Sequence, residues 1–196
     1  MQHISKRERE ITDPAQIRHI LDTAKILHLG MVNGDEPYVL PMNYGYTLED
    51  GQLTLYMHAA VQGRKLDLLQ ANPKVFFTLE CDITPFEGER PCQYGITYAA
   101  VAGKGIAEIV EDVDQKMDAM TVLMRTQTGK EFTFTEKLVS IVSVRCNIPN
   151  HCYIANFTCC SIYFFIPRVV RSNSALKLFV PAVNVQHFTA ICSSTC

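Results

Sequence analysis

Short runs of apolar and β-branched residues, bounded by glycine, proline, asparagine and aspartate, recur along this chain and are typical of strands. The sequence predicts strands over residues 26–32, 38–46, 53–58, 75–81, 94–110 and 138–144. Asn33-Gly34 is a hairpin signal between the first two strands, and Glu49-Asp50-Gly51 turns the chain into the third. Residues 82–93 contain two prolines and a glycine, so we expect a loop there.

Three other segments repeat their apolar residues at helical spacing. The first is expected to begin at Asp13-Pro14, because aspartate caps a helix and proline fits its first turn. The second begins at Gly63 and is expected to end at Asn72, since the following proline disfavours helix at that residue. The third is capped by Asp112, and its methionines are expected in the core.

Hairpins and short turns join most of these elements, which favours an antiparallel sheet over repeated βαβ units. We therefore predict an α+β fold, mainly β, with six antiparallel strands closing toward a barrel and helices flanking them. The chain has no GxGxxG, no P-loop GKS or GKT and no HExxH motif. Those absences argue against a Rossmann dinucleotide site, a P-loop nucleotide site and a zincin metal site.

Composition changes abruptly after residue 145. Residues 1–145 hold all 20 acidic residues and 15 of the 18 lysines and arginines, whereas residues 146–196 hold six of the eight cysteines. We predict one domain over residues 1–145 and an atypical Cys- and Phe-rich tail over residues 146–196. Four interpretations of the tail stay open: a frameshift product, a membrane-associated segment at 152–167, a cysteine metal site and an added hairpin that packs on a dimer.

The overall charge is close to balance, with a formal net charge of −2. No basic surface for nucleic acid is therefore expected. The polar start MQHISKRERE is unlike a secretory signal, so we expect a cytoplasmic protein with reduced cysteines, and no membrane partner. His19 has no partner that the sequence suggests, and we predict no metal site.

Arg64 and Lys65 are the strongest candidates for binding chemistry. Two cations in the first turn of a helix oppose the helix dipole, and a bound anion would offset that cost. The unpaired backbone N–H groups of such a turn are a ready phosphate site. His58, at the end of the preceding strand, points toward the same region. The simpler interpretation is a solvated helix face on which Asp67 reduces the repulsion.

Several motifs, in this order, resemble one known family. They are Arg9-Glu10-Ile11-Thr12-Asp13, the segment Pro37–Tyr46 (PYVLPMNYGY), Leu55–Ala60 (LYMHAA), Gly63–Leu69 (GRKLDLL), Asn72–Phe77 (NPKVFF) and Val101–Val110 (VAGKGIAEIV). Residues 7–145 resemble the pyridoxamine 5'-phosphate oxidase-like FMN-binding split barrels, and within them the nitroimidazole-resistance (Nim-type) branch. The match ends near Val144, which leaves the last barrel strand in doubt.

The resemblance implies a split β-barrel homodimer with FMN at the subunit interface. Arg64 and Lys65 would hold the flavin phosphate, which agrees with the helix-start argument. The strand segment Met42-Asn43-Tyr44 would line the isoalloxazine ring. Ala59 and Ala60 would lie beside the phosphate or the ribityl chain, and His58 beside the flavin and a small-molecule substrate.

By the same resemblance, the chain would be an oxidoreductase that reduces nitroaromatic compounds such as 5-nitroimidazoles. His58 would donate a proton or orient the nitro group, because histidine exchanges protons near neutral pH; a purely structural role is the alternative. Two other functions stay open: a haem-binding or haem-handling protein with His58 as a possible ligand, and a non-catalytic flavin-binding module. Deazaflavin is the further cofactor that related split barrels use.

Overall fold

The structure of the protein is a computed structural model that describes residues 9–139, 142–148 and 152–160. The chain divides into two compact units, Met1–Ile162 and Tyr163–Cys196. The described residues all belong to the first unit. Residues 161–196, which carry most of the predicted tail, lie outside them, so the four interpretations of the tail stay predictions.

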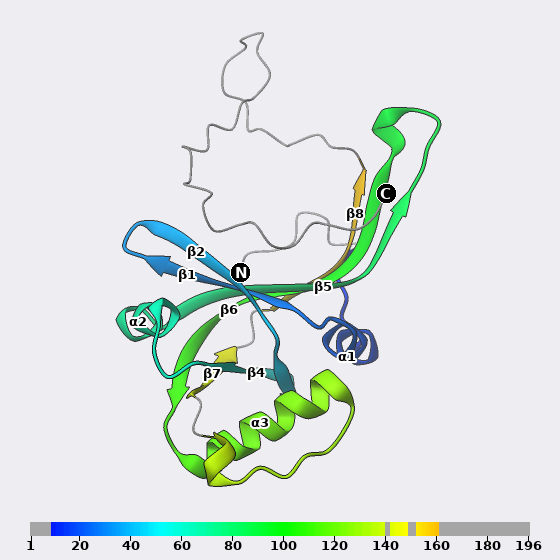
Figure 1. Ribbon diagram of the computed structural model, residues 1–196. Helices are drawn as coiled ribbons and strands as arrows, with labels where there is room; N and C mark the ends of the chain where they lie inside the picture. Colours follow the sequence, from blue (N-terminus) through cyan, green and yellow to red (C-terminus); the bar gives the residue numbers. More distant parts are fainter. Residues whose placement is uncertain (1–8, 140–141, 149–151, 161–196) are drawn as a thin grey trace, which may run out of the picture. The chain divides into compact units, whose positions relative to one another are not determined.

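The first unit is built on an eight-stranded sheet in which every neighbouring pair of strands is antiparallel (Figure 1). Its order is β2-β1-β5-β6-β7-β4-β3, and β8 pairs with β6 beside this path. The strands are β1 (Leu27–Asn33), β2 (Glu36–Met42), β3 (Gly45–Glu49), β4 (Gln52–Ala59), β5 (Lys74–Phe86), β6 (Gly95–Val110), β7 (Val142–Ile148) and β8 (Cys152–Cys160).

The two ends of this sheet path are joined by the chain itself. β2 is the first strand of the path and β3 the last, yet only Asn43 and Tyr44 separate them in sequence. No hydrogen-bonded pairing between β2 and β3 is present in the described sheet, so the barrel is open along that line. The predicted split-barrel, α+β architecture with flanking helices is confirmed.

The predicted number of six strands was wrong for two physical reasons, and one predicted loop was also wrong. The expected strand 38–46 is broken at Asn43-Tyr44, because Tyr44 turns into the core. The tail segment 152–160 adds β8. The expected loop at 82–93 instead continues β5 to Phe86, where Pro85 is tolerated because β1 pairs only with the earlier part of β5.

The last predicted strand, 138–144, was placed too early. A 3₁₀ helix, η3 (Glu136–Val139), occupies its start, and β7 begins at Val142. β7 then runs through Ile148 and pairs with both β4 and β6. The predicted domain boundary after residue 145 therefore falls inside a strand of the sheet.

Three helices flank the sheet, as predicted: α1 (Pro14–Thr23), α2 (Arg64–Ala71) and α3 (Val113–Thr128). The Asp13 carboxylate accepts from the Ala15 amide at 3.0 Å and caps α1. The Asp112 carboxylate accepts from the Gln115 amide at 2.9 Å and caps α3. None of the helices in the described ranges is long and apolar enough to cross a membrane.

The core lies between the inner faces of the strands and the buried stripe of α1. Strand residues alternate, so that Leu53, Leu55, Met57 and Ala59 are buried along β4 while the residues between them are not. The largest fully buried side chains are Tyr44, Phe77, Ile20, Leu21, Leu27, Leu29, Leu55, Met57, Leu79 and Val101. On α3, Met120 is buried and Met117 and Met124 are partly so, as the sequence predicted.

Replacing Gly45 by alanine is expected to lower the free energy of unfolding by about 2–3 kcal/mol. α3 lies so close to β3 that a Cβ at Gly45 would collide with the backbone of Leu123 and come within 2.8 Å of the Val122 carbonyl carbon. The measurement is chemical denaturation followed by circular dichroism. Gly34→Ala is the control, because its Cβ would meet nothing and only the positive φ would cost stability, about 1 kcal/mol. Equal losses in the two variants would contradict the close-packing argument.

Candidate functional site

The start of α2 presents backbone amides and two cations at one point. Gly63 precedes the helix with φ 139°, a conformation that favours glycine. The amides of Leu66 and Asp67 bond to the Gly63 carbonyl at 2.9 and 3.3 Å, so the amides of Arg64 and Lys65 precede the helical hydrogen bonds. Those N–H groups and the positive end of the helix dipole favour an anion.

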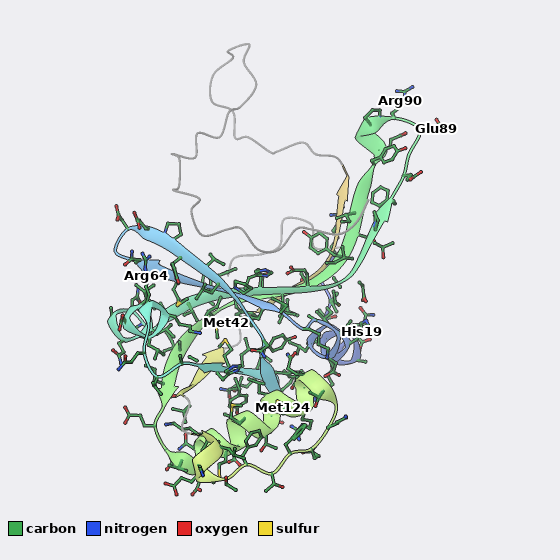
Figure 2. All side chains as sticks on the ribbon, in the orientation of Figure 1. His19, Met42, Arg64, Glu89, Arg90 and Met124 are labelled. Carbon is green, nitrogen blue, oxygen red and sulfur yellow. The ribbon has the colours of Figure 1, made fainter. Side chains whose placement is uncertain are left out.

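The two cations contact side chains of β2. Figure 2 labels Arg64 and Met42. The Arg64 guanidinium carbon lies 5.0 Å from the centroid of the Tyr38 ring, which is a cation–π contact. The Lys65 ammonium lies 4.0 Å from the sulfur of Met42, a buried residue at the end of β2. The structure thus places Arg64 and Lys65 against two side chains of β2, Tyr38 and Met42.

Lys65 is half-buried, directly after Arg64 in the first turn of α2. Burial lowers the pKa of its ammonium group, which means that the surroundings disfavour the charged form. Within the described residues, no carboxylate lies within 4.0 Å of either Lys65 or Arg64. Asp67, which the simpler interpretation invokes to reduce the repulsion, makes no such ion pair. An anion beside these two cations would offset the desolvation of Lys65.

His58 lies near the end of β4, on the face opposite the core residues Met57 and Ala59. Its Nδ1 atom is buried and has no hydrogen-bond partner in the part of the chain that the structure describes. A buried polar atom without a hydrogen-bond partner lowers the stability of the folded protein by about 1–3 kcal/mol, so such atoms are rare in native proteins. A ligand that supplies the missing partner is one way to satisfy it.

The remaining predicted site residues lie in different environments. Tyr44 is fully buried, and its hydroxyl donates toward the carbonyls of Leu21 and Ala24 at 2.8 and 3.1 Å. Burial raises the pKa of the Tyr44 hydroxyl far above its usual value. Its carbonyl accepts from the Gln127 side-chain amide at 2.7 Å, so both the side chain and the carbonyl of Tyr44 are committed to the core.

The other three predicted residues follow the chain path around that point. Asn43 is half-buried at the break between β2 and β3. Ala59 is buried at the end of β4, and Ala60 is exposed in the segment that leads to Gly63. Sequence reasoning missed one residue, Tyr38, as a contact of Arg64. Its aromatic character is visible in the sequence, but its position against α2 depends on packing.

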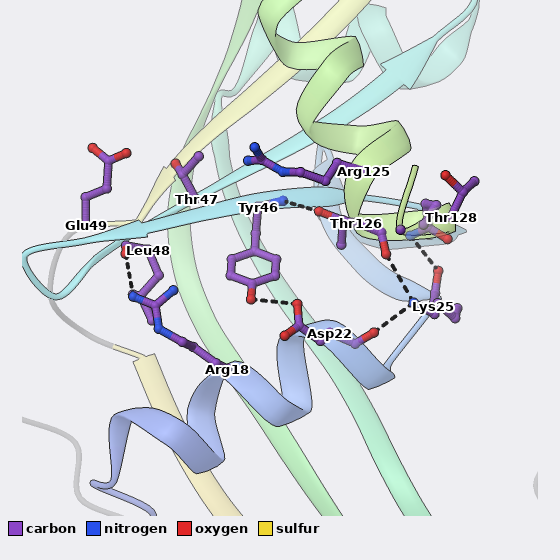
Figure 3. A pocket seen from close by; sticks show the side chains of 12 residues that line it. Arg18, Asp22, Lys25, Tyr46, Thr47, Leu48, Glu49, Arg125, Thr126 and Thr128 are labelled. Atoms are coloured by element: carbon purple, nitrogen blue, oxygen red, sulfur yellow. Dashed lines mark hydrogen bonds between the residues drawn. The ribbon is translucent and has the colours of Figure 1, made fainter. Parts of the chain in front are cut away.

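A cavity of about 680 Å³ lies elsewhere, between α1, β3 and the C-terminal end of α3 (Figure 3). Its polar groups bond mainly to one another. Lys25 donates to the carbonyls of Asp22 and Thr126 at 2.7 and 3.1 Å, and the Tyr46 hydroxyl donates to the Asp22 carboxylate at 2.8 Å. Arg18 donates to the Leu48 carbonyl at 3.2 Å. This network joins two helices to the sheet.

A second cavity, of about 330 Å³, lies between α1 and the β3–β4 turn. Its lining includes Pro14, Ile17, Leu48 and Leu53, so it is mostly apolar. Neither of these two cavities is lined by Arg64, Lys65 or His58. Lys65, which has no carboxylate partner among the described residues, and His58, whose Nδ1 atom has no hydrogen-bond partner there, therefore lie outside both cavities. We take the start of α2 as the candidate site.

Comparison with solved structures finds several proteins with a similar fold. A candidate 5-nitroimidazole antibiotic resistance protein from Bacteroides thetaiotaomicron VPI-5482 is 26% identical, with a TM-score of 0.64 over 76% of this chain and 87% of that one. The FAD and Heme binding protein from Mycobacterium smegmatis is 13% identical, with a TM-score of 0.61 over 86% and 94%. The flavocytochrome Anf3 from Azotobacter vinelandii is 14% identical, with a TM-score of 0.60 over 93% and 92%.

The last two similarities are similarities of fold, because their sequence identities are low. A comparison with curated proteins finds no match. The sequence itself matches the family described as Pyridoxamine 5'-phosphate oxidase over residues 13–149, which is well over half of the chain. This match and the split barrel confirm the resemblance that the motifs suggested: the chain belongs to the pyridoxamine 5'-phosphate oxidase family.

Proposed function

We propose that this protein binds FMN, with the flavin phosphate at the start of α2. The observation that carries the proposal is the pair Arg64 and Lys65, which has no carboxylate partner in the described ranges although Lys65 is half-buried. A phosphate would accept from the unbonded backbone amides and from both side chains. The stacking of Arg64 on Tyr38 fixes one of these donors before the ligand arrives.

The isoalloxazine ring would lie along the segment from Met42 to Tyr44. Met42 already contacts Lys65, so this segment begins beside the phosphate site. Tyr44 would support this segment from the core, since its hydroxyl and its carbonyl are both hydrogen-bonded there. Ala59 and Ala60, between His58 and Gly63, would border the ribityl chain.

We propose that the activity is reduction of nitroaromatic compounds to amines. The bound flavin would supply the electron transfer, using electrons from a donor outside this chain. His58 would deliver a proton to the nitro group, which takes up six electrons and six protons on its way to the amine and loses both oxygens as water, or would orient the nitro group. The support is the buried Nδ1 atom of His58, which has no hydrogen-bond partner among the described residues, together with the similarity at 26% identity to a candidate 5-nitroimidazole resistance protein.

We also propose a homodimer with the cofactor at the subunit interface. Val39, Gly30 and Phe76 lie opposite one another on β2, β1 and β5, and therefore on one face of the sheet. Val39 is 58% exposed and Phe76 44%, and the neighbouring Val32 and Ile106 are 42% and 47% exposed. We name these four apolar residues the outer sheet face. Exposed apolar surface of this kind is typical of an interface with another chain.

Replacing both Arg64 and Lys65 by alanine is expected to weaken FMN binding by at least about tenfold for each lost cation. The measurement is a titration of the purified protein with FMN, followed by flavin fluorescence and by the visible spectrum after gel filtration. Lys130→Ala plus Lys137→Ala is the matched control, because it removes the same charge from exposed positions that follow α3 and belong to neither α2 nor β2.

Unchanged affinity in the double variant would refute the phosphate site. The same spectrum distinguishes the cofactors, because a Soret band would indicate haem and a spectrum shifted from that of FMN would indicate deazaflavin. A turnover assay then tests the activity. Flavin bands without turnover of any nitroaromatic would indicate a non-catalytic module. Only a bound FMN with turnover supports the whole proposal.

Replacing His58 by alanine is expected to leave FMN affinity within about threefold while the rate of nitroaromatic reduction falls by about a hundredfold. The measurement compares the half-reaction of the reduced flavin with the nitro compound over a range of pH. A proton donor predicts that the pH dependence of the wild-type rate disappears in the variant. A rate and a pH profile that are both unchanged would assign His58 a structural role.

Phe76→Glu plus Val39→Glu is expected to convert the dimer into a monomer, because four charged carboxylates would otherwise meet in one apolar interface. Light scattering after gel filtration measures the mass, and the FMN titration is repeated on the variant. Leu138→Glu is the control, since Leu138 is 59% exposed and lies outside the outer sheet face. A dimer that persists in the double variant would place the interface elsewhere.

A further inference from the structure

Three residues with metal-binding side chains meet where β5 passes α1, at the labelled His19 of Figure 2. The His19 Nε2 atom lies 2.9 Å from a carboxylate oxygen of Asp82. The ligand atoms of His19, Cys81 and Asp82 all lie within 4.8 Å of one another. These residues are remote from Arg64, Lys65 and His58 in sequence and play no part in the proposed flavin chemistry.

An irregularity in β5 creates this cluster. Cys81 pairs with Ala99 and Thr84 with Thr97, so β5 carries one residue more than β6 over this stretch. Asp82 takes the extra position with φ +54°, in the left-handed region. In a regular strand, consecutive residues point to opposite faces. The bulge instead lets the side chains of both Cys81 and Asp82 reach His19.

We propose that His19, Cys81 and Asp82 form a binding site for a thiophilic divalent cation, with Zn²⁺ as the best fit. Bond lengths of about 2.0–2.3 Å place the ligand atoms of a tetrahedral zinc site about 3.3–3.5 Å apart. The present separations, from 2.9 Å to at most 4.8 Å, span that range, so small side-chain rotations suffice. A thiolate and an imidazole select zinc over Mg²⁺ and Ca²⁺.

The surroundings of His19 suit a metal ligand. Its other ring nitrogen, Nδ1, lies 3.4 Å from the Thr23 hydroxyl oxygen, one helical turn along α1. With the metal on Nε2, Nδ1–H would donate to that hydroxyl, and such a bond fixes the ring orientation of zinc-bound histidines. The His19 and Asp82 side chains are 56% and 51% exposed, so the site is open to solvent on their side.

Cys81 supplies the thiol. It is 5% exposed, and burial, together with the charge of Asp82 and a hydrogen bond to it, raises the pKa of the thiol to about 11. The metal-free thiol is therefore protonated at neutral pH. Binding of Zn²⁺ would form the Zn–S bond and release the thiol proton to solvent, with no change in oxidation state. Three protein ligands leave a fourth position for water.

Equilibrium dialysis of the reduced full-length protein against Zn²⁺, followed by elemental analysis, tests the proposal. The wild type is expected to hold one more zinc per chain than His19→Ala, Asp82→Asn or Cys81→Ser, whose affinity at this site should fall more than about a hundredfold. Thr23→Val should weaken the site by about tenfold. A Co²⁺ difference spectrum should contain a thiolate charge-transfer band that Cys81→Ser removes.

The controls separate this site from the other thiols and histidines of the chain. His28→Ala is the matched variant. His28 lies on β1, 3.7 Å from the Glu80 carboxylate of β5 and outside the cluster, so its replacement should not change zinc binding. His19 is exposed, so His19→Ala decides the question even where Cys81→Ser fails to fold. Equal zinc content in wild type and His19→Ala, or no zinc in the wild type, overturns the proposal.

Discussion

The two ends of the sheet path are held together by the packing of three consecutive residues, Asn43, Tyr44 and Gly45. They connect β2 to β3, which are the two ends of the sheet path. The buried Tyr44 hydroxyl needs an acceptor, and the last carbonyls of α1, at Leu21 and Ala24, need donors. The hydrogen bonds from the Tyr44 hydroxyl to these carbonyls meet both needs. On the other side, Gly45 lets the backbone of α3 approach closely, and the Gln127 amide donates to the Tyr44 carbonyl at 2.7 Å.

This arrangement separates the residues that hold the fold from those available to a ligand. Lys25 links the C-terminal ends of α1 and α3 through carbonyls at Asp22 and Thr126, where the helix dipoles favour a cation. Its charge is thereby used in packing. Lys65 is the opposite case, because it is half-buried at a helix start, where the dipole disfavours it. A cation in that position destabilises the ligand-free protein, so a bound phosphate would stabilise the fold as well as anchor itself.

The sequence was sufficient where structure depends on neighbours along the chain. The Asp13 and Asp112 caps, the end of α2 at Asn72-Pro73 and the Asn33-Gly34 hairpin all follow from local preferences. It failed where distant packing decides. Residues 38–46 read as one strand, because nothing local reveals that Tyr44 would find its acceptors on α1. Of the candidate site, the Arg64-Lys65 pair was visible in the sequence, but the contact with Tyr38 was not.

The two irregular points of the sheet have a common physical meaning. A regular strand alternates its side chains between two faces, so it cannot place consecutive residues on one small ligand. The break at Asn43-Tyr44 follows Met42, which contacts Lys65, and the bulge at Asp82 brings consecutive side chains to His19. Both interruptions give up ladder hydrogen bonds, and Asp82 also adopts a left-handed backbone that few residues tolerate. Such costs persist where the surrounding structure or a ligand offsets them. His19 and Asp82 are 63 residues apart, so this cluster depends on the bulge and not on any motif in the sequence.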